Sequence, residues 1–275
     1  MYLLVVRLFS LARCSRGTRS QKSRTIVAGF IQPSKADSSK YMISRIEAKI
    51  MALVVDTKDC TGLSDSELGE MADICECGDA RIDLGFLSKE REEWVLVTQV
   101  RERGKLQAFS FSTLERIGGT PCILIGVASF KRTSRRDTLL KQLMADQYRR
   151  AVLAFPDEDV LVGTRLINPD GYDAFRGLDD IVPRPEHKAS GEERAWGRRL
   201  AKRFGAEGKI DDRNFILSAS GPRQWGGLDY STPKPEKLDV SLAQFFGEVS
   251  PTEGERLVAF GWAMAEDLSS SKLMR

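Results

Sequence analysis

The stretch Thr120–Phe155 constrains the fold more than any other part of this 275-residue sequence. It begins with a run of apolar and β-branched residues, continues through a short basic turn (131–136), and ends in a long helical pattern. The helical part carries apolar residues at three- and four-residue steps, which places them along one face of a helix. These residues are Leu139, Leu140, Leu143, Met144, Tyr148, Ala151, Val152 and Phe155. A strand, a tight turn and an amphipathic helix are therefore predicted in this order.

The predicted turn gathers three arginines, Arg132, Arg135 and Arg136, where the helix begins. Thr133 or Ser134 can cap the first helical turn, because a hydroxyl oxygen accepts hydrogen bonds from free backbone N–H groups. Free N–H groups and the positive end of the helix dipole attract anions, and guanidinium groups bind phosphate oxygens in pairs. The turn is therefore a candidate site for a phosphate-bearing ligand. A basic turn exposed to solvent is the alternative explanation.

The composition is that of a soluble globular protein, with 41% hydrophobic and 29% charged residues. A net charge of +3 is too small to indicate nucleic acid or an acidic membrane as a partner. Five cysteines without the spacing of a disulfide scaffold favour reduced thiols inside a cell. The only histidine is His187, so a zinc site at the close pair Cys75 and Cys77 lacks ligands, and no metal is expected. No apolar run is long enough to cross a membrane.

Residues 1–50 differ in composition from the rest and are predicted to lie outside the folded domain. Basic residues and serine are frequent there, and the first acidic side chain is Asp37. Such a segment is typical of a mitochondrial transit peptide, and equally of upstream sequence translated from a start codon placed too early. The second explanation is favoured and predicts a cytoplasmic protein that starts at Met51, with Met42 as another plausible start. The domain is expected over residues 51–275, with a core at 53–181 and an extension at 182–275.

From Leu53 onward the pattern predicts an α+β domain with a mixed, mainly antiparallel central sheet flanked by helices. The expected strands are Leu53–Val55, Trp94–Val100, Leu106–Ile117, Pro121–Ser129, Asp159–Ile167, Arg213–Ser218 and Arg256–Met264. The expected helices begin at Ser64, Ser88, Asn168, Glu192 and Leu238, and the long helix begins at its predicted cap, Thr133 or Ser134. Turn signals between the second, third and fourth strands predict an antiparallel meander, and the helical crossover predicts parallel fourth and fifth strands. Gly221–Lys237, rich in glycine and proline, is predicted to be irregular.

This order of elements resembles that of the GNAT superfamily of acyl-CoA N-acyltransferases, over Leu53–Ile181 and more weakly beyond. In that family the fourth strand leads into a turn of the form Gln/Arg-x-x-Gly-x-Gly/Ala, whose amides hold the pyrophosphate of acetyl-CoA. Arg132 matches the first position of this turn, whereas Arg135 and Asp137 replace the two small residues. A second family pattern, Asn-x-x-Ala-x-x-x-Tyr after the fifth strand, is similar to the stretch that begins at Asn168.

The resemblance implies acetyl-CoA or another acyl-CoA as co-substrate, without a metal. The implied contacts come from the turn and from the strand ends around it: Val127, Ala128, Arg132, Thr133, Ser134, Arg135, Arg136 and Asn168. In the resembled fold the fourth and fifth strands diverge, and a backbone N–H exposed there polarises the thioester carbonyl. In this sequence that N–H would come from around Gly126–Ala128. Side chains in place of the two small residues keep the backbone amides of the turn farther from a phosphate group. The arginines can compensate for these weaker amide contacts, because their guanidinium groups bind phosphate oxygens directly.

Two side chains are candidates for the proton transfers that accompany the attack of an amine on a thioester. Glu115, on the neighbouring strand, is the candidate base, and its alternative role is to pair with Arg116 or Arg132 at a strand end. Tyr172 is the candidate proton donor to the leaving thiolate, and its alternative role is packing with the hydroxyl at the surface. The family's usual tyrosine falls at Phe175, which has no proton to donate.

Three functions are consistent with these observations. The first is transfer of an acyl group, acetyl above all, from a CoA thioester to an amine on a small molecule or a protein. The second is a non-catalytic GNAT-like binding or interaction module, favoured by the replaced glycines and by Phe175. The third is a nucleic-acid-binding regulator that uses the charged helix Glu192–Phe204, although its acidic start and sparse aromatic residues favour a solvated face. A Ser-His-Asp hydrolase does not fit, since no Gly-x-Ser-x-Gly turn is present. A homodimer remains open.

Overall fold

The computed structural model describes residues 53–80, 82–218, 226–235 and 240–274. These residues all lie within one compact unit, Glu47–Arg275. The predicted leader (1–50) and the predicted start at Met51 lie outside the described residues. Among the helices of the described part, none is both long enough and apolar enough to cross a membrane.

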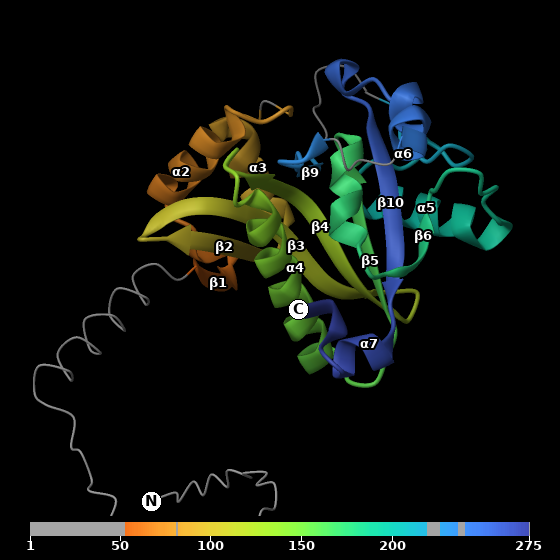
Figure 1. Cartoon of the computed structure of the whole chain (residues 1–275), viewed down its shortest axis with the longest axis horizontal. Helices are drawn as coiled ribbons and strands as arrows, with labels where there is room; N and C mark the ends of the chain where they lie inside the picture. Colours follow the sequence, from red (N-terminus) through yellow and green to blue (C-terminus); the bar gives the residue numbers. More distant parts are fainter. Residues whose placement is uncertain (1–52, 81, 219–225, 236–239, 275) are drawn as a thin grey trace, which may run out of the picture. The chain divides into compact units, whose positions relative to one another are not determined.

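Ten strands of the described residues form one mixed sheet. They are β1 (Leu53–Asp59), β2 (Leu96–Glu102), β3 (Lys105–Ile117), β4 (Thr120–Phe130), β5 (Val160–Leu166), β6 (Asp179–Val182), β7 (Ile210–Asp211), β8 (Ile216–Leu217), β9 (Leu228–Asp229) and β10 (Arg256–Ala263). The order is β1-β2-β3-β4-β9-β5-β10-β8-β7, and β6 pairs with β10 (Figure 1). Most neighbours are antiparallel, while β4, β5 and β9 pair in parallel. The structure therefore confirms the predicted α+β class, the meander β2–β3–β4 and the parallel β4–β5 pair.

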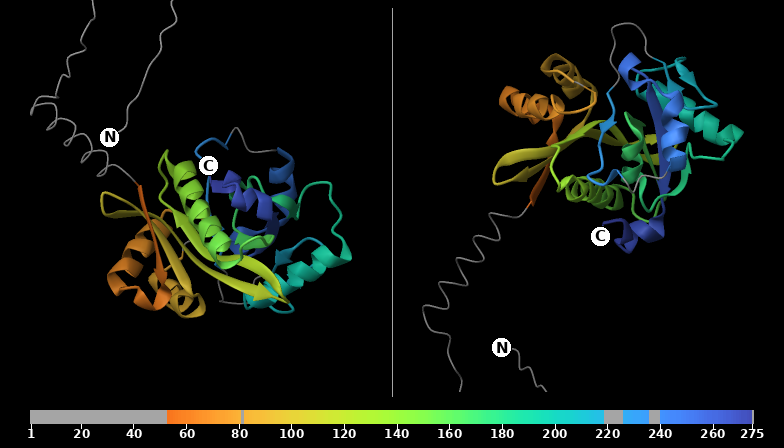
Figure 2. Two further views of the ribbon diagram at one scale, coloured as in Figure 1. Left: turned by 90° about the horizontal axis from the view of Figure 1, so that it is seen from below. Right: turned by 45° about the horizontal axis from the view of Figure 1, so that its top comes forward.

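Helices cover both faces of this sheet (Figure 2). They are α2 (Asp65–Cys75), α3 (Leu84–Glu93), α4 (Arg136–Ala154), α5 (Gly191–Arg203), α6 (Val240–Phe245), α7 (Ala265–Ser269) and the 3-10 helices η1 (Cys60–Gly62), η2 (Pro169–Phe175), η4 (Phe246–Glu248), η5 (Pro251–Glu253) and η6 (Lys272–Met274). Neighbouring residues of a strand point to opposite faces. Accordingly, Gln99 donates a hydrogen bond to Glu67 of α2 (2.9 Å), whereas Thr98 accepts one from Gln147 of α4 (3.0 Å). Helices α2 and α4 thus lie on opposite faces of the sheet.

The long helix α4 was predicted correctly from its apolar stripe. The stripe residues from Leu139 to Ala151 are buried, and Val152 and Phe155 are partly buried. Its predicted cap was wrong. The helix begins after Arg135, and no side chain caps it, so neither Thr133 nor Ser134 has the predicted role.

Three other predictions on the chain need correction. The piece expected within Ser88–Glu93 is longer and starts at Leu84, because Asp83 caps it by accepting a hydrogen bond from the Phe86 N–H (2.7 Å). The strand expected over Arg213–Ser218 is reduced to the two residues of β8. The stretch expected to be irregular contains β9, which pairs with two central strands.

The predicted capping box at the start of α2 is confirmed and extends into a charged network. The Ser64 N–H donates to the Glu67 carboxylate (2.9 Å), which also accepts from the Lys58 ammonium (2.7 Å). Burial raises the pKa of Glu67, but the bonds from Lys58, Ser64 and Gln99 outweigh it and lower the pKa to about 2. Ionised Glu67 therefore joins α2 to β1 and β2.

We expect Glu67→Gln to remove an acid-sensitive part of the stability. The folded pKa of about 2 lies below the ordinary value of 4.5, so the contribution is complete above pH 4.5 and is lost as pH falls toward 2. Urea unfolding at about pH 6 and about pH 3 should show a larger loss in the native protein than in the variant. Glu92→Gln on the exposed side of α3 serves as the control. Equal losses in the native protein and Glu67→Gln would contradict this account.

Candidate functional site

Strands β4 and β5 begin side by side and then diverge. Their parallel pairing runs from Cys122 opposite Leu161 to Ile125 opposite Thr164. At that point β4 contains one residue more than β3, because Ile125 and Val127 face consecutive residues of β3 and Gly126 has no partner there. Such a bulge bends a strand and increases its twist. The divergence expected from the family resemblance is therefore present, and it follows from the bulge at Gly126.

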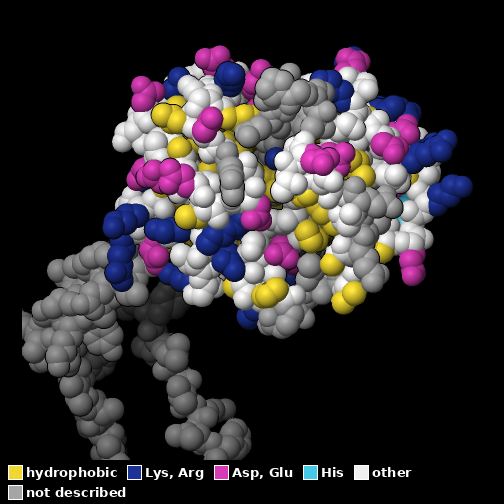
Figure 3. Space-filling model, turned by 90° about the horizontal axis from the view of Figure 1, so that it is seen from above, with side chains coloured by type: hydrophobic (Ala, Val, Ile, Leu, Met, Phe, Trp, Pro, Cys, Tyr) yellow, Lys and Arg dark blue, Asp and Glu magenta, His cyan; other side chains and the backbone are white. Residues whose placement is uncertain are grey.

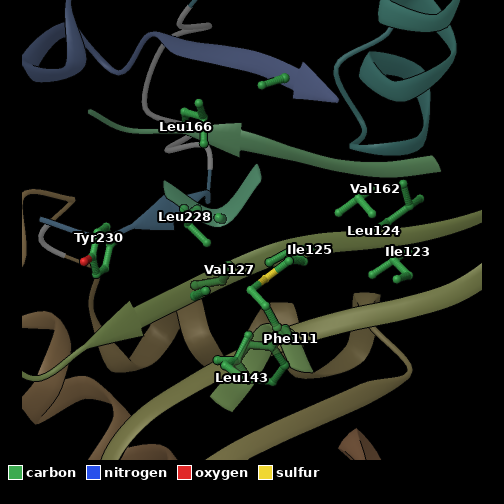
Figure 4. Packing of buried hydrophobic residues seen from close by; sticks show 14 of the residues in the cluster. Phe111, Ile123, Leu124, Ile125, Val127, Leu143, Val162, Leu166, Leu228 and Tyr230 are labelled. Carbon is green, nitrogen blue, oxygen red and sulfur yellow. The ribbon is translucent and has the colours of Figure 1, made fainter. Parts of the chain in front are cut away.

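The space between the diverging strands is filled by the chain itself. The segment Gly226–Thr232, which we call the inserted segment, contributes β9 parallel to both strands. The N–H of Ala128 donates to the Gly227 carbonyl (3.1 Å), and the N–H of Ile167 donates to the Leu228 carbonyl (3.4 Å). Figure 4 shows Leu228 between the strand that carries Val127 and the strand that carries Leu166. The Ala128 N–H, one of the backbone groups around Gly126–Ala128 that were predicted to polarise a thioester, is thus hydrogen-bonded within the chain.

Two glycines allow the inserted segment to come this close. A Cβ on Gly226 would lie 2.5 Å from Val127 Cγ2, and one on Gly227 would lie 2.6 Å from the Arg165 carbonyl oxygen. Both distances are shorter than any side chain tolerates against packed neighbours. The next residues, Leu228 and Tyr230, are fully buried. The segment is therefore packed as tightly as a core strand.

Arg132, the first residue of the predicted phosphate-binding turn, is bonded to the inserted segment. Its Nη2 donates to the Asp229 carboxylate at 2.5 Å and lies 3.5 Å from Asp79. The Asp229 side chain is only 1% exposed and also accepts from the Ala80 N–H (3.2 Å). Burial raises the pKa of Asp229, and the charge of Arg132 opposes this shift. A carboxylate therefore stands where the sequence predicts a phosphate group.

The end of the inserted segment is bonded to α4 and η2. Arg136 Nη2 donates to the Thr232 carbonyl (2.9 Å), and the Thr232 N–H donates to Asp170 (2.8 Å). The Tyr230 hydroxyl donates to Asp137 in the first turn of α4. Burial raises the pKa of Asp170, and the nearby carboxylate of Asp173 adds to the shift. Carboxylates thus surround the predicted turn.

Two of the remaining residues predicted to hold the coenzyme, Arg135 and Asn168, are bonded to other parts of the chain. Arg135 donates to Glu102 of β2, and the Asn168 side-chain amide donates to Asp79 (2.9 Å). The Thr133 carbonyl accepts from the Arg136 N–H (3.3 Å), and Ser134 is exposed. Their role toward a coenzyme stays a prediction.

Both side chains predicted to transfer protons, Glu115 and Tyr172, are hydrogen-bonded within the chain. Glu115 is opposite Cys122, at the end of β4 where β4 and β5 are still paired. Six residues along a strand separate Cys122 from Ala128, which corresponds to roughly 20 Å. The Glu115 carboxylate is bonded to Arg203 of α5 (2.5 Å), rather than to Arg116 or Arg132. Glu115 thus lies far along β4 from the divergence, and its role as a base stays a prediction.

Tyr172 is buried rather than placed with its hydroxyl at the surface. The hydroxyl donates to the Pro183 carbonyl (3.0 Å), and burial raises its pKa. This hydrogen bond joins η2 to the loop after β6. The contact of Tyr172 stabilises the fold. Proton donation by Tyr172 to a thiolate stays a prediction.

Two neighbouring hollows lie beside the inserted segment. One, of about 490 Å³, is bounded by η2, the loop after β6 and the residues after Thr232. The other, of about 280 Å³, lies between α4, η2 and η6 and has an apolar floor that includes Leu140 and Met144. Both are lined by Asp137, Asp173 and Arg176. Acidic and basic side chains are therefore mixed around these hollows.

Other candidate sites receive less support from the described residues. In that part of the chain, no group of three or more His, Cys, Asp or Glu side chains is arranged to hold a metal. Cys75 is buried, which raises its pKa to about 12, while Cys77 is exposed. His187 contacts the Glu193 carboxylate (2.8 Å) at the start of α5.

The basic helix α5 is largely neutralised. Arg198 is paired with Asp212, Arg203 with Glu115, and Lys202 with Glu207. On the face in Figure 3, basic and acidic side chains alternate, and no large area carries one sign alone. A broad basic surface is the usual footprint of a nucleic-acid-binding protein. Helix α5 and the face in Figure 3 therefore give no support to the third function considered above.

Comparisons with known proteins give similar structures only. No family model matches the chain, and no curated protein matches it. The ribosomal-protein-S18-alanine N-acetyltransferase from Escherichia coli is similar over 50% of this chain and 86% of its own, with 14% identity and a TM-score of 0.33. A conserved protein of unknown function from Enterococcus faecalis V583, named a probable N-acyltransferase, is similar over 49% and 38%, with 13% identity and a TM-score of 0.31. An acetyltransferase candidate from Pyrococcus horikoshii is similar over 77% and 90%, with 11% identity and a TM-score of 0.35.

Proposed function

We propose that this chain keeps the architecture of an acyl-CoA N-acyltransferase but works as a non-catalytic binding module. The observation that carries the proposal is the inserted segment between β4 and β5. The segment accepts hydrogen bonds from the Ala128 N–H and from the Arg132 guanidinium. A thioester carbonyl would need the first of these donors, and a phosphate group would need the second. An acyl-CoA molecule and this segment exclude each other sterically.

The energy required to open the site supports the same conclusion. Leu228 and Tyr230 are fully buried, and each would be exposed if the inserted segment left. Exposing a buried side chain of this size costs about 1.5–3 kcal/mol, so the two together cost about 3–6 kcal/mol. A site that is open in so small a fraction of molecules binds its ligand roughly 10²–10⁴ times more weakly. Acyl-CoA at ordinary concentrations would leave the site closed.

The binding surface of such a module is the pair of hollows beside the segment. Three aspartates and three basic residues line the larger hollow: Asp137, Asp170, Asp173, Arg176, Arg184 and Lys234. A balanced set of charges suits a small ligand that carries both a positive and a negative group. The hollows remain accessible while the inserted segment is in place.

The test is the change in melting temperature of the native protein with CoA, acetyl-CoA and a longer acyl-CoA. We expect no change, because the closed form has no room for the thioester arm. A protein that did bind would be stabilised by about 2.7 kcal/mol at a ligand concentration a hundredfold above the dissociation constant. A shift of that size with CoA, absent with adenosine alone, would contradict the proposal.

A second candidate is acyl transfer from acyl-CoA to an amine on a small molecule or protein. Arg132 and Arg136 favour it, since both lie at the start of α4 beside the diverging strands. In this candidate the inserted segment would leave, and the freed Ala128 N–H would polarise the thioester carbonyl. Positioning the amine would supply most of the acceleration. Release of free thiol from acetyl-CoA, dependent on an added amine, would favour this candidate over the first.

A further inference from the structure

Strand β1 lies at the margin of the sheet, and among the described residues only β2 pairs with it (Figure 1). Just after β1, the Cys60 N–H donates to the Val95 carbonyl on the β2 side (2.9 Å). The direction of the backbone N–H and C=O groups alternates along an antiparallel strand. The backbone groups of Val55, Thr57 and Asp59 therefore point away from β2. A row of such groups at a sheet margin is a template for pairing with another strand.

We propose that β1 pairs in an antiparallel arrangement with β1 of a second copy of this chain, about a twofold axis at Thr57. In this register Asp56 of one copy lies opposite Lys58 of the other, and the same pair recurs across the axis. An axis at Asp56 would instead place two carboxylates opposite each other, and an axis at Val55 would place Asp56 opposite Val54. The charges on β1 therefore select one register. This association goes beyond the proposed function, since no residue of β1 lines either hollow.

The side chains of Asp56 and Lys58 are placed to form these pairs. Residues two apart in a strand share a face, and Lys58 marks the face of α2 because its ammonium donates to Glu67 (2.7 Å). Asp56 is exposed on that face, and the Lys58 side chain keeps 31% of its surface exposed beside Glu67. The backbone groups of both residues point toward β2, so the two side chains would meet at a non-hydrogen-bonded position, where side chains are closest.

The mixture of signs on β1 distinguishes it from a protected sheet margin. Charged side chains at a margin usually keep other chains away, because identical copies repel each other when one sign prevails. On β1 a carboxylate and an ammonium stand two residues apart on one face. Opposite charges directly across two antiparallel strands stabilise the pairing, and like charges oppose it. The same charges therefore attract a second copy in the register centred on Thr57.

Exposed apolar side chains also gather at this margin. Three of the five large apolar side chains that the described residues expose most lie here: Val54 (57%), Val95 (51%) and Leu153 (84%). Val54 is on β1, and Val95 stands beside the end of β1. Leu153 lies about two turns along α4 from Asp146, whose carboxylate accepts from the Thr57 hydroxyl (2.7 Å). The association would therefore shield apolar surface as well as pair charges.

The expected dimer is small and reversible. Specific interfaces that bury less than about 1,200 Å² are typical of transient complexes, and one pair of short strands belongs to this class. The charge pairs stay near solvent, so salt screens them. We expect the association to weaken as the salt concentration rises.

Two charge variants test the register, because each spoils the pairing alone and they restore it together. Asp56→Lys places lysine opposite lysine in a dimer of that variant, and Lys58→Glu places acid opposite acid. In a mixed dimer of the two variants every lysine lies opposite an acid. Glu253→Lys is the control, since it makes the same change in net charge at an exposed position before β10, near the other side of the sheet.

Sedimentation velocity on the full chain, measured over a range of protein concentrations, gives the monomer–dimer equilibrium. We expect a reversible dimer for the native protein and for Glu253→Lys. The dissociation constant of Asp56→Lys should be at least about tenfold higher. An equimolar mixture of Asp56→Lys and Lys58→Glu should recover the dimer.

A native protein that stays monomeric at the highest concentration would overturn the proposal. A dimer that Asp56→Lys weakens no more than Glu253→Lys does would overturn it too, because the contact would then lie elsewhere. Lys58→Glu loses the bond to Glu67, so its folding is checked by circular dichroism. If it does not fold, the comparison of Asp56→Lys with Glu253→Lys decides alone.

Discussion

Replacing Arg132 by alanine is expected to lower the free energy of unfolding by about 3–5 kcal/mol near pH 7. The guanidinium is the cation that contacts Asp229, whose side chain is only 1% exposed. Removing it leaves a buried carboxylate with the Ala80 N–H at 3.2 Å but without a charge in contact. An uncompensated buried charge is among the most destabilising changes known in proteins. Urea unfolding of the native protein and the variant measures the difference.

The pH dependence of the stability should identify Asp229 as the cause of the loss in Arg132→Ala. Burial already raises the pKa of Asp229 above 3.8, and the loss of Arg132 should raise it further. The folded variant then binds a proton that the unfolded chain does not, so its stability falls as pH rises above 3.8. The deficit of Arg132→Ala should therefore be smaller at about pH 5 than at about pH 8. Adding Asp229→Asn should recover part of the loss. A deficit independent of pH and of Asp229 would place the effect elsewhere.

Much of the sheet could be predicted because local patterns determine it. The strands from Leu96 to Phe130 are joined by turns whose glycines have positive φ, at Gly104 (78°), Gly118 (61°) and Gly119 (92°). Glycine adopts this conformation readily, and such turns bring adjacent strands together. The buried stripe of α4 likewise follows from spacing along one helix. In each of these cases the residues that make contact are close in sequence.

The inserted segment could not be predicted in this way. Gly226 and Gly227 look like a loop signal, and a two-residue strand shows no alternation to detect. Its partners, Ala128 and Arg132, lie about a hundred residues earlier, so the pairing depends on the tertiary fold. The only local sign was the pair of buried-type residues Leu228 and Tyr230 with Asp229 between them. An acidic residue between apolar neighbours predicts a buried ion pair only if its basic partner can also be identified, and Arg132 cannot be identified as that partner from the sequence.

The position of Glu115 shows a second limit of the sequence. Glu115 lies on the strand beside β4, as predicted, but the register of that strand sets its distance from the divergence. Counting pairs from the turn at Gly118 places Glu115 opposite Cys122, among the first residues of β4. The divergence begins only after Ile125. The register of a hairpin can be read from its turn, whereas the bulge at Gly126 that sets the divergence cannot.

That bulge is the basis of the last prediction, because the divergence of β4 and β5 depends on a residue without a side chain. A Cβ at Gly126 would lie 2.0 Å from Cε2 of Trp94, within the indole ring. The ring cannot easily move away, since its N–H donates to Glu90 (2.7 Å) and Phe204 lies against it at 6.2 Å between centroids. We therefore expect Gly126→Ala to lower the free energy of unfolding by about 3 kcal/mol or more.

Gly69→Ala provides the matched comparison, because it makes the same change in an uncrowded helix. Its added methyl group meets nothing within 4 Å, and alanine in a helix is more stable than glycine by about 1 kcal/mol. The two alanine variants should thus shift the midpoint of urea unfolding in opposite directions. Trp94→Leu should also make Gly126→Ala less harmful, because the new methyl group then has room, and a non-additive double mutant is the signature of direct contact. Equal stability of Gly126→Ala and the native protein would show that the bulge is not held against Trp94, and the divergence of β4 and β5 would then need another cause.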